Sequence, residues 1–147
     1  MSLPSVSKGD AFIFYGLLKQ GAAGMPGHID LETAGTFEHP CRFRAKMYDL
    51  GGFPGVVAGD TLCHGVIWRI KDVSVLAELD DFEDVVPGNR ERSVYWRDTW
   101  PVRDDMGTAT GETAQIYVYR ASLEDWPRVA DGNWPLGKGR SRKMGDV

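Results

Sequence analysis

The sequence predicts a single α+β domain that is mainly β. Its 147 residues are the usual size of one domain, and 42% hydrophobic against 26% charged residues is an ordinary balance for a soluble globular protein. A chain of this length can bury a hydrophobic core without disulfides or metals. Its eighteen glycines indicate many turns, which favours a strand-rich fold over a helical bundle.

The first expected element is a buried strand. Residues 11–15 form a short, continuous apolar run that stops at Gly16, which is typical of a buried strand broken by a glycine turn. Residues 1–9 are small and polar, and they are left out of the expected fold. The glycine-rich stretch 17–27 predicts a loop or a short irregular helix.

Strands separated by tight turns are expected over residues 31–59. The run Gly-Gly-Phe-Pro-Gly at 51–55 is a strong turn signal, and a short strand is expected to follow it at 56–57. The Gly-Asp pair at 59–60 then predicts a further break before a central strand over 63–70.

One helix and one hairpin complete the expected body. Asp72 is a good helix N-cap, and residues 73–84 have helical periodicity. Strands are expected over 94–102 and 113–120, with residues 103–111 as the exposed loop that joins them.

The predicted domain covers residues 10–121. Residues 122–147 are rich in Trp, Pro and Gly, and they predict a C-terminal extension that packs on the body or trails from it. One helical turn is expected at 124–126, and Trp126 and Trp134 are expected to dock on the body. No repeat, low-complexity tract or linker divides the sequence into two domains.

The charge of the chain bears on its partners. A net charge of −4 argues against nucleic acid, because no basic field would offset repulsion by phosphates, and the basic run at 138–143 is interpreted as a solvated terminus. The sequence has no signal-peptide pattern at its start and no apolar run near the length of a membrane span. We therefore expect a cytoplasmic monomer or homodimer without a membrane partner, in which Cys41 and Cys63 are buried free thiols.

Glu83 is the candidate catalytic residue. On a helix over 73–84 with about 100° per residue, Glu83 falls at about 340° when Leu76 is set to zero, between Leu76 and Leu79. A carboxylate on this apolar stripe is costly unless it is paired or functional, and burial raises its pKa towards the range of a general base at neutral pH. Asp80, at about 40° on the same wheel, would raise that pKa further as a like charge.

Two alternatives for Glu83 stay open. The helix could end before this residue, so that the helical wheel no longer describes its direction. Otherwise the carboxylate forms a structural salt bridge with one of three arginines on the following segment, namely Arg90, Arg92 or Arg97.

The turn after the first strand is a candidate anion site. In Tyr15-Gly16-Leu17-Leu18 a strand ends in glycine, so the chain can turn sharply and leave successive N–H groups pointing outward. Such a nest binds a carboxylate or a developing oxyanion. The alternative is an ordinary glycine turn that binds nothing.

Other chemical motifs are missing from the sequence. The histidines His28, His39 and His64 have no metal-ligand spacing and the two cysteines form no CxxC pair, so we expect no metal. There is no GxGxxG motif, Walker loop or GxSxG elbow, so we expect no nucleotide cofactor. Tyr95 and Tyr117 lie on expected strands, either as core residues or as hydroxyls that line a cleft.

Five short motifs, in this order, resemble the gamma-glutamylcyclotransferase-like (AIG2-like) family. They span about residues 12–120, and they are Tyr15-Gly16-Leu17-Leu18, the glycine- and proline-containing stretch 48–54, Leu79-Asp80-Asp81-Phe82-Glu83, Tyr95-Trp96-Arg97 and Ala114-Gln115-Ile116-Tyr117. Position 17 is Leu where family enzymes usually have Ser or Thr. This change keeps backbone N–H donation but removes a hydroxyl contact.

The resemblance implies a small mixed β-barrel with flanking helices, no cofactor and a small-molecule gamma-glutamyl substrate. It implies that Glu83 takes a proton from the free α-amino group, which attacks the γ-carbonyl and closes 5-oxoproline, and that the leaving amine receives the proton. The backbone of the first turn would bind the gamma-glutamyl part. The candidate substrate-binding residues are Tyr15, Gly16, Leu17, Leu18, Tyr95 and Tyr117.

Two other functions stay open beside this one. A binding module without catalysis could keep the same pocket, and the Leu at position 17 motivates this alternative. The same scaffold could also run a different reaction, such as cleavage of a gamma-glutamyl group from a biosynthetic intermediate. Ligand stabilisation without product would favour the first, and identification of the product would favour or exclude the second.

Overall fold

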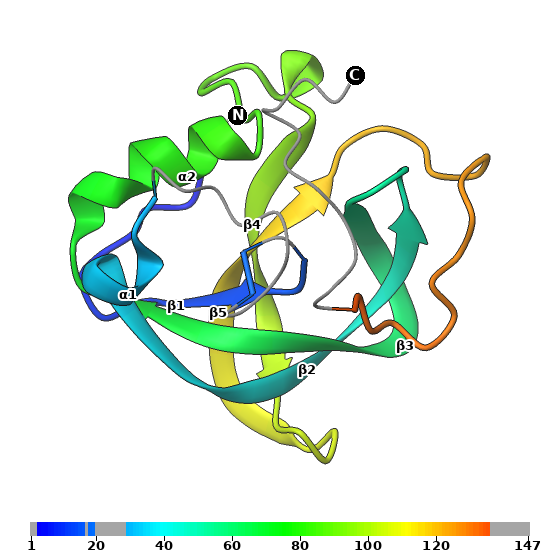
Figure 1. The fold of residues 1–147 in the computed structure, drawn as a ribbon, viewed down its shortest axis with the longest axis horizontal. Helices are drawn as coiled ribbons and strands as arrows, with labels where there is room; N and C mark the ends of the chain where they lie inside the picture. The colour runs from blue at the N-terminus through cyan, green and yellow to red at the C-terminus, as the bar shows by residue number, and fades with distance from the viewer. Residues whose placement is uncertain (1–2, 17, 20–28, 136–147) are drawn as a thin grey trace.

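The computed structural model describes residues 3–16, 18–19 and 29–135, and within them the chain is mostly β. Short helices occupy four places along these residues (Figure 1). The elements in chain order are β1 (Ala11–Phe14), α1 (Leu31–Ala34), β2 (Gly35–Asp49), β3 (Pro54–Ile70), η1 (Val73–Val75), α2 (Leu76–Phe82), η2 (Arg90–Arg92), β4 (Tyr95–Arg103) and β5 (Ala109–Tyr119). The predicted mainly β class is confirmed.

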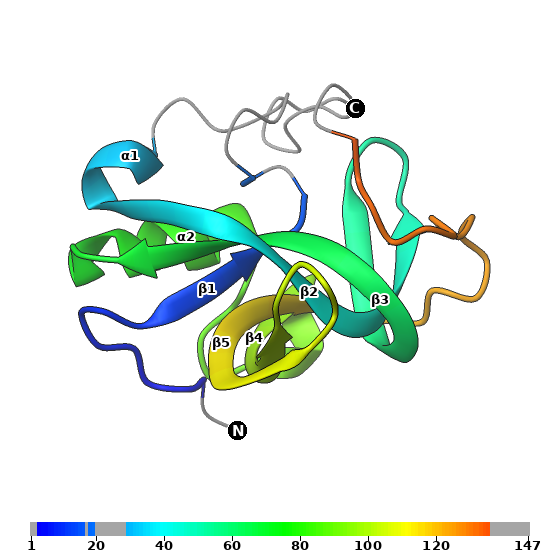
Figure 2. The ribbon, with the colours of Figure 1, turned by 90° about the horizontal axis from the view of Figure 1, so that it is seen from below.

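The five strands close into a barrel in the order β1-β3-β2-β4-β5. The pairs β1–β3, β2–β3, β2–β4 and β4–β5 are antiparallel, whereas β1 meets β5 in parallel at Phe12 and Gln115. Closure leaves few strand edges that could pair with another chain. Figures 1 and 2 show the long, bent β2 and β3 wrapping around the barrel, with α2 lying along its outside.

The expected break at Gly59–Asp60 is wrong, because β3 runs without interruption from Pro54 to Ile70. The register of its pairing with β2 shifts at this point: Ala45 lies opposite Thr61, but the next residue, Lys46, lies opposite Val57. The glycine therefore belongs to a bulge rather than to a turn, which bends the long strand as barrel closure requires. The turn expected at 51–55 does separate the two strands, and Gly51 and Gly52 have φ values of 90° and 123°.

Two short helices were not expected: α1 occupies residues 31–34, where a strand was predicted, and η2 occupies residues 90–92. The other elements lie close to their predicted places. β4 and β5 form the expected hairpin, but pairing continues to Arg103 and Ala109, so the loop is only 104–108. Asp72 caps the helical segment as expected, since its carboxylate accepts the N–H of Ser74 at 3.0 Å. The segment begins as the 3-10 turn η1, and α2 ends at Phe82, before the predicted limit at residue 84.

Two apolar clusters lie on opposite faces of the strands. One contains residues of all five strands, including Ile13, Phe43 and Ile116, and it fills the inside of the barrel. The other joins the outer side of β1, β3, β4 and β5 to the helices, with Leu79 and Phe82 of α2 fully buried against it. Cys41 and Cys63 belong to the inner cluster as free thiols, and burial raises their pKa to about 12 and about 11.

The described residues after β5 lie against β2 and β3. The backbone of Arg128 forms an isolated antiparallel β-bridge with Tyr48 of β2. The N–H of His64 in β3 donates to the carbonyl of Gly132 at 2.8 Å. Trp134 is 1% exposed and joins the inner cluster, as expected, but Trp126 is 42% exposed, so the expectation that it docks is wrong. The basic run at 138–143 lies outside the described residues.

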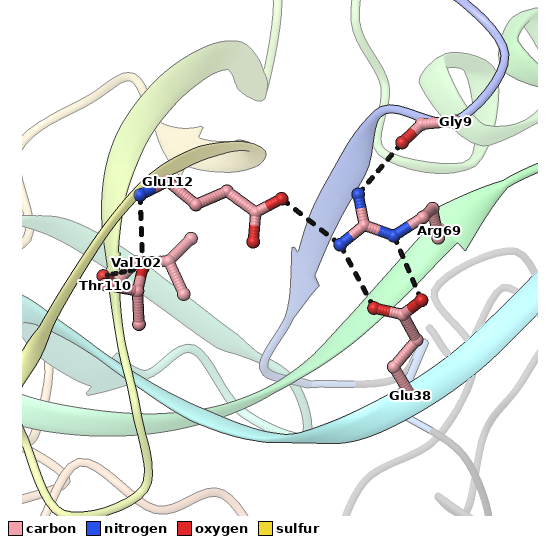
Figure 3. A network of polar contacts seen from close by, with 6 residues as sticks. All are labelled: Gly9, Glu38, Arg69, Val102, Thr110 and Glu112. Carbon is pink, nitrogen blue, oxygen red and sulfur yellow. Dashed lines mark hydrogen bonds and ion pairs between the residues drawn. The ribbon is translucent and has the colours of Figure 1, made fainter.

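An ionic network on the surface ties three strands together (Figure 3). The Arg69 guanidinium makes two contacts of 3.0 Å with the Glu38 carboxylate, one of 3.1 Å with Glu112, and donates to the carbonyl of Gly9 at 2.9 Å. These contacts join β3 to β2 and β5 outside the apolar clusters. No helix within the described residues has both the length and the apolar character needed to cross a membrane.

Candidate active site

One pocket is lined by most of the residues that the sequence singled out. Its lining includes Glu83 from the end of α2, Gly16 and Leu18 from the turn after β1, Tyr95 from β4 and Tyr117 from β5. The remaining lining is mostly apolar and consists of Ile13, Phe14, Tyr15, Phe53, Pro54 and Phe82. Counted together with the open solvent at its mouth, the empty space between these residues is about 360 Å³. Leu17, also a predicted site residue, lies outside the described residues.

The end of α2 places Glu83 at this pocket. The N–H of Asp84 donates to Asp81 and the N–H of Val85 donates to Asp80, which is the hydrogen-bond pattern of a Schellman cap with Glu83 as the last half-helical residue. Asp84 takes the left-handed position with φ 56°, where glycine is usual. The apolar contact of such a cap is supplied by buried Val85, so the cap holds Glu83 on a fixed turn, half-buried, beside Phe82.

Gly16 lets the turn after β1 come close to the start of β3. A Cβ atom at this position would lie 2.5 Å from Cγ and 2.8 Å from Cδ of Pro54, so no larger residue fits without movement. The turn then closes with a hydrogen bond of 3.1 Å from the N–H of Lys19 to the Gly16 carbonyl. The glycine therefore serves a close backbone approach at the pocket wall.

A buried acid that the sequence reasoning assigned to another role lies behind the pocket. Asp80 is 7% exposed, and its Oδ1 and Oδ2 accept hydrogen bonds from Nε and Nη2 of Arg97 at 3.0 and 3.2 Å. The Tyr117 hydroxyl donates to Oδ1 of the same carboxylate at 2.6 Å. Arg97 also donates through Nη1 to the Gln115 side chain at 2.7 Å and to the carbonyl of Pro4 at 2.8 Å.

This network corrects the expectation for Asp80. Asp80 was expected to act on Glu83 as a like charge. The Arg97 guanidinium, however, donates hydrogen bonds to both oxygens of the Asp80 carboxylate and compensates most of its charge. The signal was present in the sequence, since Asp80 lies four residues after Leu76 and so borders the apolar stripe of α2. Arg97 lies on an expected strand, and an arginine that is buried on a strand requires an acid partner. A search for that partner could have identified the pair with Asp80.

The tyrosine hydroxyls at the pocket donate into the protein. Tyr117 donates to Asp80, and Tyr95 donates to the carbonyl of Pro54 at 2.5 Å. Tyr15, at the wall next to Gly16, donates to the carbonyl of Tyr117 at 2.5 Å. Burial raises the pKa of Tyr117 well above its ordinary value, and the charges of Asp80 and Glu83 raise it further, so its hydroxyl stays protonated.

The site can therefore offer one carboxylate, backbone groups of a tight turn, and hydroxyl oxygens within a largely apolar lining. This set of groups suits the binding of a small polar molecule and the transfer of a proton. Among the described residues, no three His, Cys, Asp or Glu side chains are arranged to hold a metal ion.

The chain resembles known proteins over most of its length. The family model described as "Gamma-glutamyl cyclotransferase, AIG2-like" matches residues 12–136. A Vibrio cholerae protein named "Putative gamma-glutamylcyclotransferase" is 32% identical over 120 residues, which make up 82% of this chain and 90% of that protein. The "Gamma-glutamylcyclotransferase family protein YtfP" of Escherichia coli K12 is 32% identical over 89 residues, or 60% of this chain and 66% of that protein.

Solved structures with the same arrangement include relatives of these proteins. The solution structure of E. coli YtfP superposes with a TM-score of 0.61 over 84% of this chain and 95% of that one, at 25% identity. A mouse AIG2-like protein superposes with a TM-score of 0.55 over 83% of this chain and 86% of that one, at 22% identity, and supports the shared fold alone.

Proposed function

This chain belongs to the gamma-glutamyl cyclotransferase, AIG2-like family, and on that premise we propose that it releases 5-oxoproline from a gamma-glutamyl amine or peptide, with Glu83 as the general base. One observation carries the proposal: Glu83 and the turn at Gly16 and Leu18 line the same pocket. A carboxylate and a backbone turn, from elements far apart in the sequence, are the two groups that this reaction needs side by side.

The reaction is intramolecular, so the protein needs to supply little chemistry. The α-ammonium group first loses one proton to solvent, and the free lone pair of the nitrogen attacks the γ-carbonyl carbon while Glu83 takes a second proton from that nitrogen. A carbon–nitrogen bond forms to close the ring, the bond to the leaving amine breaks, and Glu83 returns the proton to that amine. Because the nucleophile and the carbonyl belong to the same molecule, binding the substrate in the conformation that brings them together supplies much of the rate enhancement.

The turn after β1 supplies the other half of the site. Its backbone N–H groups bind the α-carboxylate of the substrate or the oxyanion that develops on the γ-carbonyl oxygen. This role needs no side chain at position 17, so a Leu there is compatible with it. The aromatic and aliphatic residues of the wall exclude water and so strengthen these polar contacts.

The proposal is tested by incubating the purified protein with a panel of gamma-glutamyl amines and gamma-glutamyl dipeptides. 5-Oxoproline and the free amine are quantified by chromatography with mass detection. The proposal predicts both products in equal amounts from at least one member of the panel. Absence of 5-oxoproline from every member, at enzyme concentrations comparable to substrate, would contradict it.

A second candidate function is binding without turnover, and Leu at position 17 favours it, because the hydroxyl usual in family enzymes is missing there. The same panel separates the two functions. A gamma-glutamyl compound that raises the melting temperature of the protein but yields no 5-oxoproline supports a binding module.

A further inference from the structure

The residues behind the Tyr117 hydroxyl determine whether it donates or accepts a hydrogen bond towards the pocket. The Asp80 carboxylate already accepts N–H groups of Arg97 on both of its oxygens, so it is ionised and can only accept hydrogen bonds. The contact of 2.6 Å between Tyr117 and Asp80 must therefore use the single proton of the phenol. With that proton committed, any hydrogen bond from the Tyr117 oxygen towards the pocket is one that it accepts.

The charge of the pocket indicates which kind of ligand group it would bind. Of the residues that line it in the described part of the chain, Glu83 alone carries a formal charge, and that charge is negative. The Tyr95 hydroxyl, which donates to the Pro54 carbonyl, is likewise an acceptor towards a ligand. Glu83 and Tyr117 line this same pocket. This end of the pocket thus presents acceptors to a ligand group that carries several N–H donors.

On the basis of the proposed function, we infer that the Tyr117 hydroxyl accepts an N–H of the substrate's α-amino group and that Asp80 is the positioning residue that keeps it an acceptor. After the ammonium group has lost one proton to solvent, one of its two remaining N–H groups donates to Glu83 and the other to Tyr117. These two hydrogen bonds set the direction of the lone pair, and Glu83 takes the proton that it holds as the ring closes. Asp80 and Arg97 touch no substrate and act only through Tyr117.

The experiment uses two ligands that differ only in the α-amino group: gamma-glutamyl-propylamide and glutaryl-propylamide, which keeps the carboxylate and the amide. For wild type and each variant we compare the KM of the first with the inhibition constant of the second. Tyr117→Phe should raise the KM by about tenfold or more, as expected for a lost hydrogen bond to a charged group, and leave the inhibition constant within about twofold.

Asp80→Leu combined with Arg97→Met provides a second, independent variant. The apolar side chains leave the phenol proton of Tyr117 without its acceptor, so the proton is free to turn towards the pocket and act as a donor there. The KM should rise as in Tyr117→Phe, although the aromatic hydroxyl is still present, and the inhibition constant should again stay unchanged. Tyr119→Phe is the matched control, because Tyr119 lies two residues further along β5 and does not line the pocket.

The outcomes distinguish this inference from the proposed function. If the wild type shows no turnover, calorimetric dissociation constants replace the kinetic ones, and selective weakening of the amine-bearing ligand in Tyr117→Phe supports the inference while the reaction fails. The inference is overturned if Tyr117→Phe weakens both ligands equally or neither, or if the wild type binds neither ligand.

Discussion

Replacement of Asp80 by Asn tests whether a buried ion pair holds α2 against the barrel. Asn keeps the shape of the side chain but leaves the Arg97 guanidinium, 2% exposed, without a compensating charge. Breaking a buried pair from one side typically costs about 3–5 kcal/mol. Arg97 keeps its contacts with Gln115 and the Pro4 carbonyl, which favours the lower end, so we expect a loss of about 3 kcal/mol.

The free energy of unfolding is measured by urea denaturation of wild type and variants at neutral pH. The control is Glu38→Gln, which breaks the solvent-exposed pair with Arg69 shown in Figure 3 and should cost about 1 kcal/mol or less. Adding Arg97→Met to Asp80→Asn removes the uncompensated charge and should restore at least half of the loss. If Asp80→Asn costs no more than Glu38→Gln, or if the added Arg97→Met destabilises the protein further, the buried pair does not hold α2 against the barrel.

Three further predictions concern stability and reactivity. Asp84→Gly should stabilise the protein by about 1 kcal/mol in urea denaturation, because the backbone at position 84 has a φ of 56°, which glycine adopts without strain and Asp does not. A loss of stability would contradict this. Cys41 and Cys63, whose pKa values are raised by burial to about 12 and about 11, should react with a thiol reagent at about pH 8 only after unfolding; rapid labelling of the native protein would contradict this. The raised pKa of Tyr117 means that the native state keeps a proton that the unfolded chain loses at its ordinary pKa of about 10, so stability should fall as the pH rises above about 10. Tyr117→Phe should make that fall shallower, and an identical slope in both proteins would count against it.

The sequence predicted the fold well where local signals agree with each other. The apolar run of β1, the turn at 51–55 and the hairpin of β4 and β5 combine strand-like residues with turn residues at the right spacing. The break expected at Gly59–Asp60 failed, because a glycine in a strand marks either a turn or a bulge, and only the pairing with β2 decides between them.

The candidate site shows the same division. Helical periodicity and motif order led to Glu83 and to the turn after β1, and the structure puts both at one pocket. The role of Asp80 was predicted wrongly, because a helical wheel gives the direction of a side chain but does not show its partner on a neighbouring strand, here Arg97 of β4. The bidentate contact with Arg97 depends on how α2 packs across β4, which is tertiary information.

The kcat of Glu83→Gln on the best gamma-glutamyl substrate decides whether Glu83 is the general base. The amide keeps the size of the side chain but cannot take the proton, so 5-oxoproline release should fall by about 10²–10⁴-fold while the free energy of unfolding changes by less than about 1 kcal/mol. Glu78→Gln, at an exposed position of the same helix, should release 5-oxoproline at the wild-type rate. Wild-type turnover in Glu83→Gln would contradict the account.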